Sequence, residues 1–318
     1  MRQLAIVLLA VAVIGGAYYS VSTNTGLVPA RVQAGVTLEG KNIGGYTEAE
    51  LGAYLDSLIA QLTELPVQAK VDNITKGIIP GVAGRRIERS ITIAKALSAG
   101  KNEQVLYAWE HILPEPTPLD LPIYQGNPHK KQVTLVVNVA WGNDELVEML
   151  DILDKYEVKT SFFLVGRWAD KFPELVQEIH KRGHEFGNHA YSDPHLPLLS
   201  EEKMKEEIVL TTTAIHKAVG QVPVLFFSPP YNDFNVKVVQ VAASLDYQTV
   251  LCSLDTADWM RPGVDRIVRR IVPNAHNGAI VLMHPTEQTP AALDLMIPAL
   301  LSKGYELVPL STLLSPER

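Results

Sequence analysis

The chain has 318 residues, a length that suggests about two domains. It holds 28 lysines and arginines against 35 aspartates and glutamates, which gives a formal net charge of −7 at pH 7. Because no basic excess is available to neutralise a phosphate backbone, nucleic acid is excluded as a partner class. The single cysteine, Cys252, excludes an internal disulfide and a zinc site built from cysteines.

The first segment is an uncharged apolar run, residues 4–21, that follows Arg2. A helix of this length spans about 27 Å, close to the hydrocarbon thickness of a bilayer. A cleaved signal peptide is the alternative, but no A-x-A site precedes the polar stretch, and Tyr18 and Tyr19 lie where an interfacial anchor would. We therefore predict a cytoplasmic tip and signal-anchor transmembrane helix in residues 1–25. This places the following domains outside the cell membrane, or in a secreted protein if the signal is cleaved.

Residues 31–112 are predicted to form a small α+β module. Thr47 is expected to cap a helix, and Ser90 a second, shorter one. The apolar face of the first helix follows the i, i+3, i+4 spacing through Leu51, Tyr54, Leu55, Leu58, Ile59 and Leu62. Prolines at 114, 116, 118 and 122 then predict a stiff, extended linker over residues 113–130.

Residues 131–318 alternate between apolar strand-like runs and amphipathic helices. The expected strands are Val133–Ala140, Val158–Val165, Glu185–His189, Val224–Ser228, Tyr247–Leu254, Ala279–His284 and Tyr305–Leu310. This alternation predicts an α/β fold, either a parallel barrel or a doubly wound sheet. Polar residues occur where the strands end, at Asn138, His189, Ser228, Asp255 and His284. Since barrels of this class carry their active sites at the carboxyl ends of the strands, the site is expected there.

Several stretches of this region resemble the polysaccharide deacetylase family, the NodB-homology carbohydrate esterases. They are residues 158–194, FFSPPYNDFN (226–235), SLDTADW (253–259) and IVLMH (280–284). The resemblance implies a distorted (β/α)7 barrel that removes N- or O-acetyl groups from chitin-like or peptidoglycan glycans. It also implies a divalent metal held by an aspartate and two histidines, an aspartate base and a histidine acid.

The chain departs from the family pattern at four positions. Ala140 replaces the aspartate base and Trp141 the metal-binding aspartate. Asp193 stands in place of the second metal-binding histidine, and Ser228 in place of the arginine that orients the base. His189 and the motifs around Asp255 and His284 are kept, a combination that resembles a sporulation-associated, degenerate subgroup of the family.

The remaining residues still offer roles in catalysis. His284 is expected to act as the acid, with the Asp255 carboxylate as the partner of its imidazolium. The alternative is that His284 is a structural residue at the end of a strand, with Asp255 as its hydrogen-bond partner and no role in catalysis. His189 and Asp193 are the candidate metal ligands, and Asp144 or His195 is the candidate third ligand, since three protein ligands are usual at catalytic zinc. Zinc is the expected ion, with cobalt or manganese as alternatives.

Four residues are candidates for contact with the sugar: Tyr231, Pro230, Trp259 and Trp141. Residues 35–100 are similar to a peptidoglycan-binding module found beside cell-wall proteins. The favoured hypothesis is a membrane-anchored, metal-dependent deacetylase with an altered ligand set. The alternatives are a catalytically silent glycan-binding or scaffolding protein of the cell wall or spore envelope, and a hydrolase of a non-sugar amide or ester. The expected partners are a cell-wall glycan and the membrane.

Overall fold

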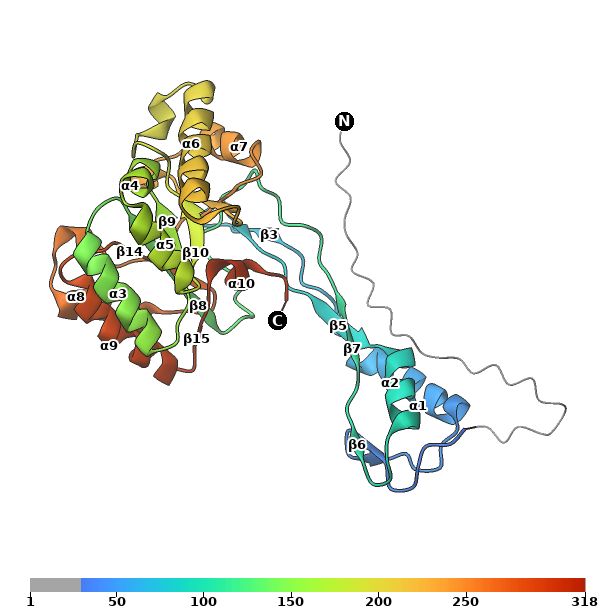
Figure 1. Ribbon diagram of the computed structural model, residues 1–318. Helices are drawn as coiled ribbons and strands as arrows, with labels where there is room; N and C mark the ends of the chain where they lie inside the picture. Colours follow the sequence, from blue (N-terminus) through green and yellow to red (C-terminus); the bar gives the residue numbers. More distant parts are fainter. Residues whose placement is uncertain (1–29, 318) are drawn as a thin grey trace. The chain divides into compact units, whose positions relative to one another are not determined.

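The computed structural model describes residues 30–317, which form two compact units (Figure 1). The first comprises residues 30–58 and 88–108, and the second residues 59–87 and 109–317. The division differs from the predicted boundary at 112 because strand β5 (Gly84–Ile87) pairs with β7 (Trp109–Ile112) inside the second unit. The predicted signal-anchor, residues 1–25, lies outside the described residues. Among the helices of residues 30–317, none is long and apolar enough to cross a membrane.

The first unit is a small α+β module, as predicted. Its elements are β1 (Thr37–Leu38), β2 (Lys41–Asn42), the start of α1 (Glu48–Leu62), α2 (Arg89–Ser98) and β6 (Gln104–Val105). Thr47 caps α1 in a capping box, because its hydroxyl accepts from the Glu50 N–H and the Glu50 carboxylate accepts from the Thr47 N–H. The predicted Ser90 cap is wrong. The Glu88 carboxylate accepts the Ile91 N–H at the start of α2, and Ser90 donates to that carboxylate.

The second unit begins with two short antiparallel pairs, β3 (Lys70–Val71) with β4 (Ile78–Ile79) and β5 with β7. The predicted linker of residues 113–130 holds no helix or strand, but its second half packs onto this unit. Ile123 is 2% exposed and pairs with Val250. The Lys130 ammonium donates to the Thr312 carbonyl at 2.6 Å. Residues 113–130 therefore lie within the second unit and do not connect it to the first.

A parallel sheet forms the centre of the second unit. Its strands are β8 (Gln132–Val139), β9 (Ser161–Leu164), β10 (Glu185–Asn188), β11 (Phe226–Phe227), β12 (Gln248–Thr249), β13 (Leu254–Asp255), β14 (Ala279–Met283) and β15 (Glu306–Leu307). Their order is β12-β11-β10-β9-β8-β14-β13, and β15 also pairs with β8. Every pairing in this sheet is parallel.

The expected ring of seven strands is confirmed only in part. The predicted strand Tyr247–Leu254 is two short strands, because the chain leaves β11 after Val250 and joins β14 at Ser253. Val250 N–H donates to the Phe227 carbonyl, whereas Ser253 N–H donates to the Ile280 carbonyl. The chain itself connects the two ends of the sheet here, and the hydrogen-bond ladder is interrupted.

Helices surround this sheet (Figure 1). They are α3 (Asn143–Lys155), α4 (Gly166–Lys171), α5 (Pro173–Lys181), α6 (Glu201–Val219), α7 (Val236–Ala243), α8 (Val264–Ile271), α9 (Thr289–Ser302) and α10 (Leu310–Leu314). Four short 3-10 turns are Leu196–Leu198, Pro230–Asn232, Asp258–Met260 and Val272–Asn274.

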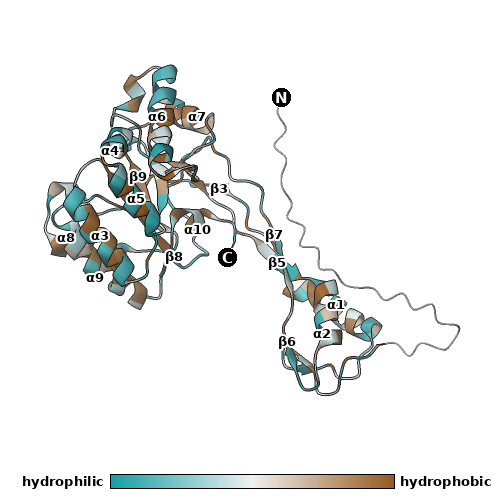
Figure 2. Cartoon of the chain, viewed as in Figure 1, coloured by the Kyte–Doolittle hydropathy of each residue, from teal (hydrophilic) through white to brown (hydrophobic). Residues whose placement is uncertain are grey.

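The core explains the continuous apolar runs of the strands. Alternate β8 residues, Val133 to Val139, belong to the cluster shared with the helices, whereas Val136 belongs to a second cluster with Phe163 and Ile280. Both faces of the strand are therefore buried. Helix α3 buries one face through Leu146, Met149, Leu150 and Leu153 and carries hydrophilic residues elsewhere (Figure 2).

Candidate functional site

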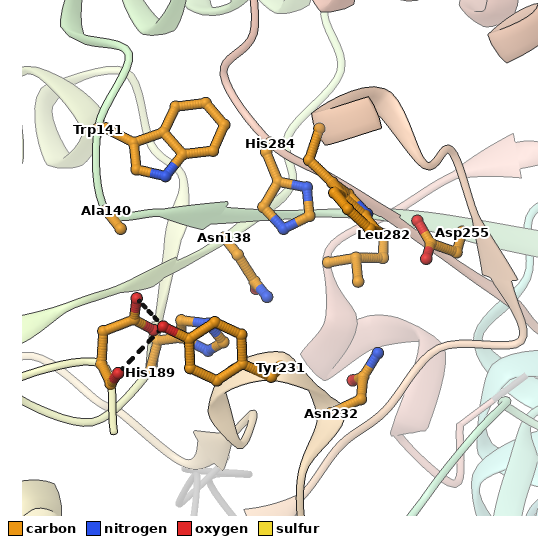
Figure 3. Close-up of a pocket in the computed structure, with 11 residues that line it drawn as sticks. Asn138, Ala140, Trp141, His189, Tyr231, Asn232, Asp255, Leu282 and His284 are labelled. Atoms are coloured by element: carbon orange, nitrogen blue, oxygen red, sulfur yellow. Dashed lines mark hydrogen bonds between the residues drawn. The ribbon is translucent and has the colours of Figure 1, made fainter. Parts of the chain in front are cut away.

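A pocket of about 450 Å³ lies at the carboxyl ends of the strands (Figure 3). It is lined by Asn138, Ala140, Trp141, His189, Asp193, Tyr231, Asn232, Asp255, Trp259, Leu282 and His284. β8 supplies Asn138 and ends before Ala140, whereas His189 follows β10 and His284 follows β14. The predicted meeting of strand ends is found here for Asn138, His189, Asp255 and His284. Ser228 lies outside the lining and contributes its backbone carbonyl.

His189 is held in one orientation. Its Nδ1 lies 2.7 Å from the Ser228 carbonyl oxygen. Because a carbonyl only accepts hydrogen bonds, Nδ1 carries the proton and the lone pair is on Nε2. Burial holds the pKa of this imidazole well below its usual value. His189 is therefore a neutral ring that presents an acceptor.

Asp193 lies on a loop that α6 fixes. The Glu207 carboxylate of α6 accepts the N–H groups of Tyr191 and Ser192, at 2.8 and 2.7 Å. Asp193 itself has a φ of 61°, a left-handed conformation tolerated best by Gly, Asn and Asp. Its Oδ2 accepts from the Tyr231 hydroxyl at 3.1 Å. Burial and this carboxylate raise the pKa of the Tyr231 phenol, which therefore stays a donor.

The two candidates for a third metal ligand do not join His189 and Asp193. Asp144 is exposed in the first turn of α3 and does not line the pocket. His195 lies outside the lining as well, because it pairs with Asp233 at 2.8 Å and stacks on Tyr231. No group of three histidine, cysteine, aspartate or glutamate side chains in residues 30–317 is arranged to hold a metal ion. The donor set therefore does not fit the three-ligand catalytic metal that the family resemblance implies.

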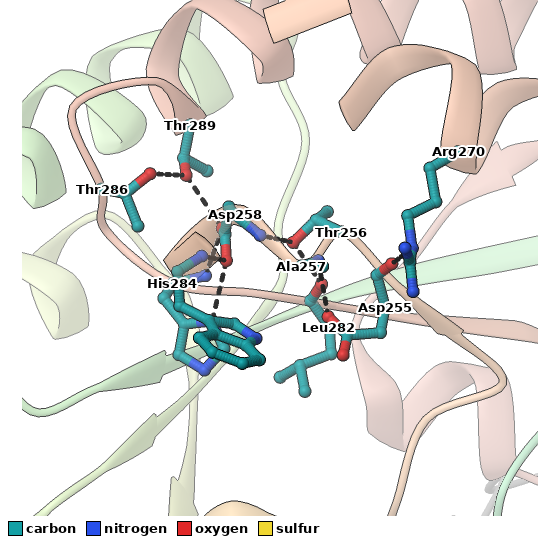
Figure 4. A network of polar contacts seen from close by, with 10 residues as sticks. Asp255, Thr256, Ala257, Asp258, Arg270, Leu282, His284, Thr286 and Thr289 are labelled. Atoms are coloured by element: carbon teal, nitrogen blue, oxygen red, sulfur yellow. Dashed lines mark hydrogen bonds and ion pairs between the residues drawn. The ribbon is translucent and has the colours of Figure 1, made fainter. Parts of the chain in front are cut away.

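His284 is paired with Asp258, which corrects the predicted pairing with Asp255 (Figure 4). The His284 Nδ1 lies 2.9 Å from Asp258 Oδ1, and the backbone N–H of His284 donates to Asp258 Oδ2 at 2.7 Å. Asp258 is fully buried and also accepts from the Thr289 hydroxyl. Asp255 instead accepts the Ala257 N–H, at 2.8 Å.

This reversal has a local cause. Ala257 has a φ of 51°, so the chain turns sharply between the two carboxylates. Asp258 is directed inward to His284, and Asp255 keeps its place at the end of β13, on the wall of the pocket (Figure 3). The sequence offered a signal, since both aspartates belong to the same D-x-x-D-W stretch, but the spacing alone does not say which one faces the histidine.

Three aromatic side chains stand at the mouth of the pocket. Trp141 is 46% exposed, and its ring is stacked on that of His284, with centroids 6.0 Å apart and an interplanar angle of 15°. Trp259 and Tyr231 are exposed as well. Pro230 is buried and does not line the pocket, so its predicted contact with the sugar has no support.

Cys252 takes no part in this chemistry. Burial raises the pKa of its thiol to about 12. A thiol of this kind has almost no thiolate at neutral pH and is a poor nucleophile. Cys252 is therefore a structural thiol.

Comparison with known proteins names the family. The polysaccharide deacetylase model matches residues 125–250. A peptidoglycan-N-acetylglucosamine deacetylase of Bacillus cereus is 38% identical over 173 residues, which cover 52% of this chain and 80% of that protein. The chain belongs to the polysaccharide deacetylase family. The Bacillus subtilis protein YlxY, which is uncharacterized, is 35% identical over 80% of each chain.

Solved structures extend this likeness beyond the deacetylase domain. A CE4 family pseudoenzyme from Bacillus anthracis is 34% identical in sequence, and its structure matches with a TM-score of 0.70. The match covers 84% of this chain and 96% of the pseudoenzyme chain. A mutant form of that pseudoenzyme with restored enzymatic activity matches with the same TM-score at 33% identity. Catalytic members and a pseudoenzyme are thus both among the relatives.

Proposed function

We propose that this chain is a glycan-binding protein of the cell envelope that does not hydrolyse acetyl groups. Its ligand class is a peptidoglycan or chitin-like glycan, the class named for the deacetylases to which it is similar. The envelope location rests on the apolar segment of residues 4–21. The pseudoenzyme among the solved relatives supports the absence of turnover.

One observation carries the proposal. The indole of Trp141 is stacked on His284 inside the pocket, at the position where the family pattern has a metal-binding carboxylate. An indole offers no metal ligand, but it offers a flat apolar face of the kind that packs on a sugar ring. Its neighbour Ala140, at the position of the family's base, offers no group that accepts a proton from water. The end of β8, where the family pattern has the catalytic base and a metal ligand, therefore offers a surface for binding a sugar.

Hydrolysis is the second candidate, and the His284–Asp258 pair favours it. An imidazole whose Nδ1 proton is held by a buried carboxylate is suited to give a proton to a leaving amine. Protonation of the leaving group is only one part of amide hydrolysis. The attacking water still needs activation, and the pocket places no carboxylate at residue 140 for that step.

The test is glycan binding measured beside acetate release. Full-length protein in detergent is titrated with an acetylated chito-oligomer and with peptidoglycan fragments by calorimetry, while free acetate is measured in the same samples. We expect binding without acetate release. Trp141→Ala should weaken binding several-fold, because the sugar ring loses the flat apolar face of the indole.

Trp109→Ala is the matched control, because it also removes an indole but Trp109 packs against Arg85 outside the pocket. Its affinity for the glycan should equal that of the wild type. Equal losses in both variants, or no binding by the wild type, would overturn the proposed function.

A further inference from the structure

The floor of the pocket carries an amide that has no partner. Asn138 is 6% exposed, and its Oδ1 is buried without a hydrogen bond from any described residue. Figure 3 shows this side chain in the middle of the pocket, with His189 and Tyr231 to one side and Asp255 to the other. A buried polar group left unpaired costs about 1–3 kcal/mol. The Asn138 oxygen is closed to a ligand in this arrangement, so the groups around Asn138 decide what the pocket prefers.

The walls around Asn138 present mostly acceptors. Asp193 and Asp255 contribute carboxylates from opposite loops, and His189 contributes the Nε2 lone pair. His284 adds a second imidazole, whose Nδ1 is directed to Asp258. The Tyr231 hydroxyl, a donor, is already directed to Asp193. A matching ligand must bring donors.

The charge of the lining is negative and uncompensated within the pocket. None of the described lining residues is a lysine or an arginine. Arg270 approaches from α8, but its Nε donates to the backbone carbonyl of Asp255 at 2.7 Å, so the Asp255 side chain is left to the pocket. The exposed rings of Trp141 and Trp259 complete the wall, and aromatic faces also attract cations.

An acetamido group and a free amine fit these walls differently. An acetamido group brings one N–H donor together with a carbonyl that would face two carboxylates and the Nε2 lone pair of His189. An ammonium brings three donors and a positive charge. We infer that the pocket selects a glycan residue with a free amino group, a de-N-acetylated hexosamine, over its acetylated counterpart. This inference rests on the proposed glycan-binding function and gives its ligand the chemistry of a deacetylation product.

The experiment compares two pentamers of one backbone, the fully acetylated chito-pentamer and the fully deacetylated glucosamine pentamer. Full-length protein is titrated with each by calorimetry at two salt concentrations. The amine pentamer should bind at least about tenfold more tightly, and its advantage should shrink at high salt because the added attraction is ionic. Equal or tighter binding of the acetylated pentamer would overturn the inference and leave the proposed function standing. Binding of neither pentamer would overturn both.

Variants show whether the preference belongs to the pocket. Asp193→Asn and Asp255→Asn keep the side-chain shape and remove one charge each, so either should reduce the preference for the amine pentamer several-fold. Asp265→Asn removes the same charge from an exposed position on α8 outside the pocket and should leave both affinities unchanged. A preference that survives both pocket variants, or falls equally in Asp265→Asn, would show general attraction to an acidic protein and contradict the inference.

Discussion

At the scale of single residues, three positions distinguish this pocket from the family pattern. Ala140 removes a proton acceptor, Trp141 adds a ring, and Asp193 exchanges an imidazole for a carboxylate. Each change was visible in the sequence because the surrounding motifs fix the alignment. Their combined effect was not, since the stacking of Trp141 on His284 and the exclusion of His195 depend on where the loops run.

A buried histidine at the opposite ends of the strands gives a prediction on pH and stability. His184 lies just before β10, its Nδ1 accepts the Thr160 N–H, and burial lowers the pKa of its imidazole to about 4. In the unfolded chain the same group has a pKa near 6.5. Between these values only the unfolded state binds the proton, so stability is complete above about pH 6.5 and is lost as the pH falls towards 4.

The lost contribution is about 3 kcal/mol across that window. His184→Asn keeps an acceptor for Thr160 and cannot titrate. Urea unfolding at pH 7 and at pH 4 should therefore show a smaller pH-dependent loss of unfolding free energy in His184→Asn than in the wild type, by about this amount. Parallel profiles for the two proteins would show that His184 is not the buried neutral group described here.

At the scale of elements, the helices follow the sequence pattern closely and the strands less so. The helix predicted to follow the Thr47 cap is α1, Glu48–Leu62. The run Tyr247–Leu254 looks like one buried strand in sequence, but its two halves pair with different neighbours. Apolar periodicity reports burial and not the partner of each hydrogen bond, so this break could not be predicted.

The turn that presents Trp141 depends on a glycine, which gives a second prediction. Gly142 has a φ of 77°, and a Cβ added there would lie 2.0 Å from the Pro285 carbonyl oxygen. Gly142→Ala should therefore destabilise the protein by at least about 2 kcal/mol more than a positive φ alone costs, and it should weaken glycan binding because Trp141 is displaced.

Gly183→Ala is the matched control for that turn. It has nearly the same φ, 76°, but its added Cβ would meet only the Lys159 side chain at 3.9 Å. Thermal unfolding should show a loss of about 1 kcal/mol and binding should be unchanged. Equal effects of the two substitutions on stability and glycan binding would mean that the turn at Gly142 does not position the Trp141 indole.

At the scale of the whole molecule, the sequence predicted an α/β domain with its site at the strand ends, and both are found. The boundary between the units could not be read from it, because residues 59–87 join the second unit through pairing with residues 109–112, which are distant in the chain. Long-range pairing of short strands leaves no periodic signal. The assignment of the first unit to peptidoglycan binding stays a prediction.

The central claim is that the donor set, and not the fold, separates this chain from a deacetylase. The most direct measurement is acetate release from an acetylated chito-oligomer, with zinc present, by the wild type and by a variant that combines Ala140→Asp, Trp141→Asp and Asp193→His. Ala140→Asp alone serves as the control, since it returns a carboxylate without the other two donors. The account predicts zinc binding and acetate release by the combined variant and neither by the wild type or the control. Zinc-dependent acetate release by the wild type, abolished by a chelator, would contradict it.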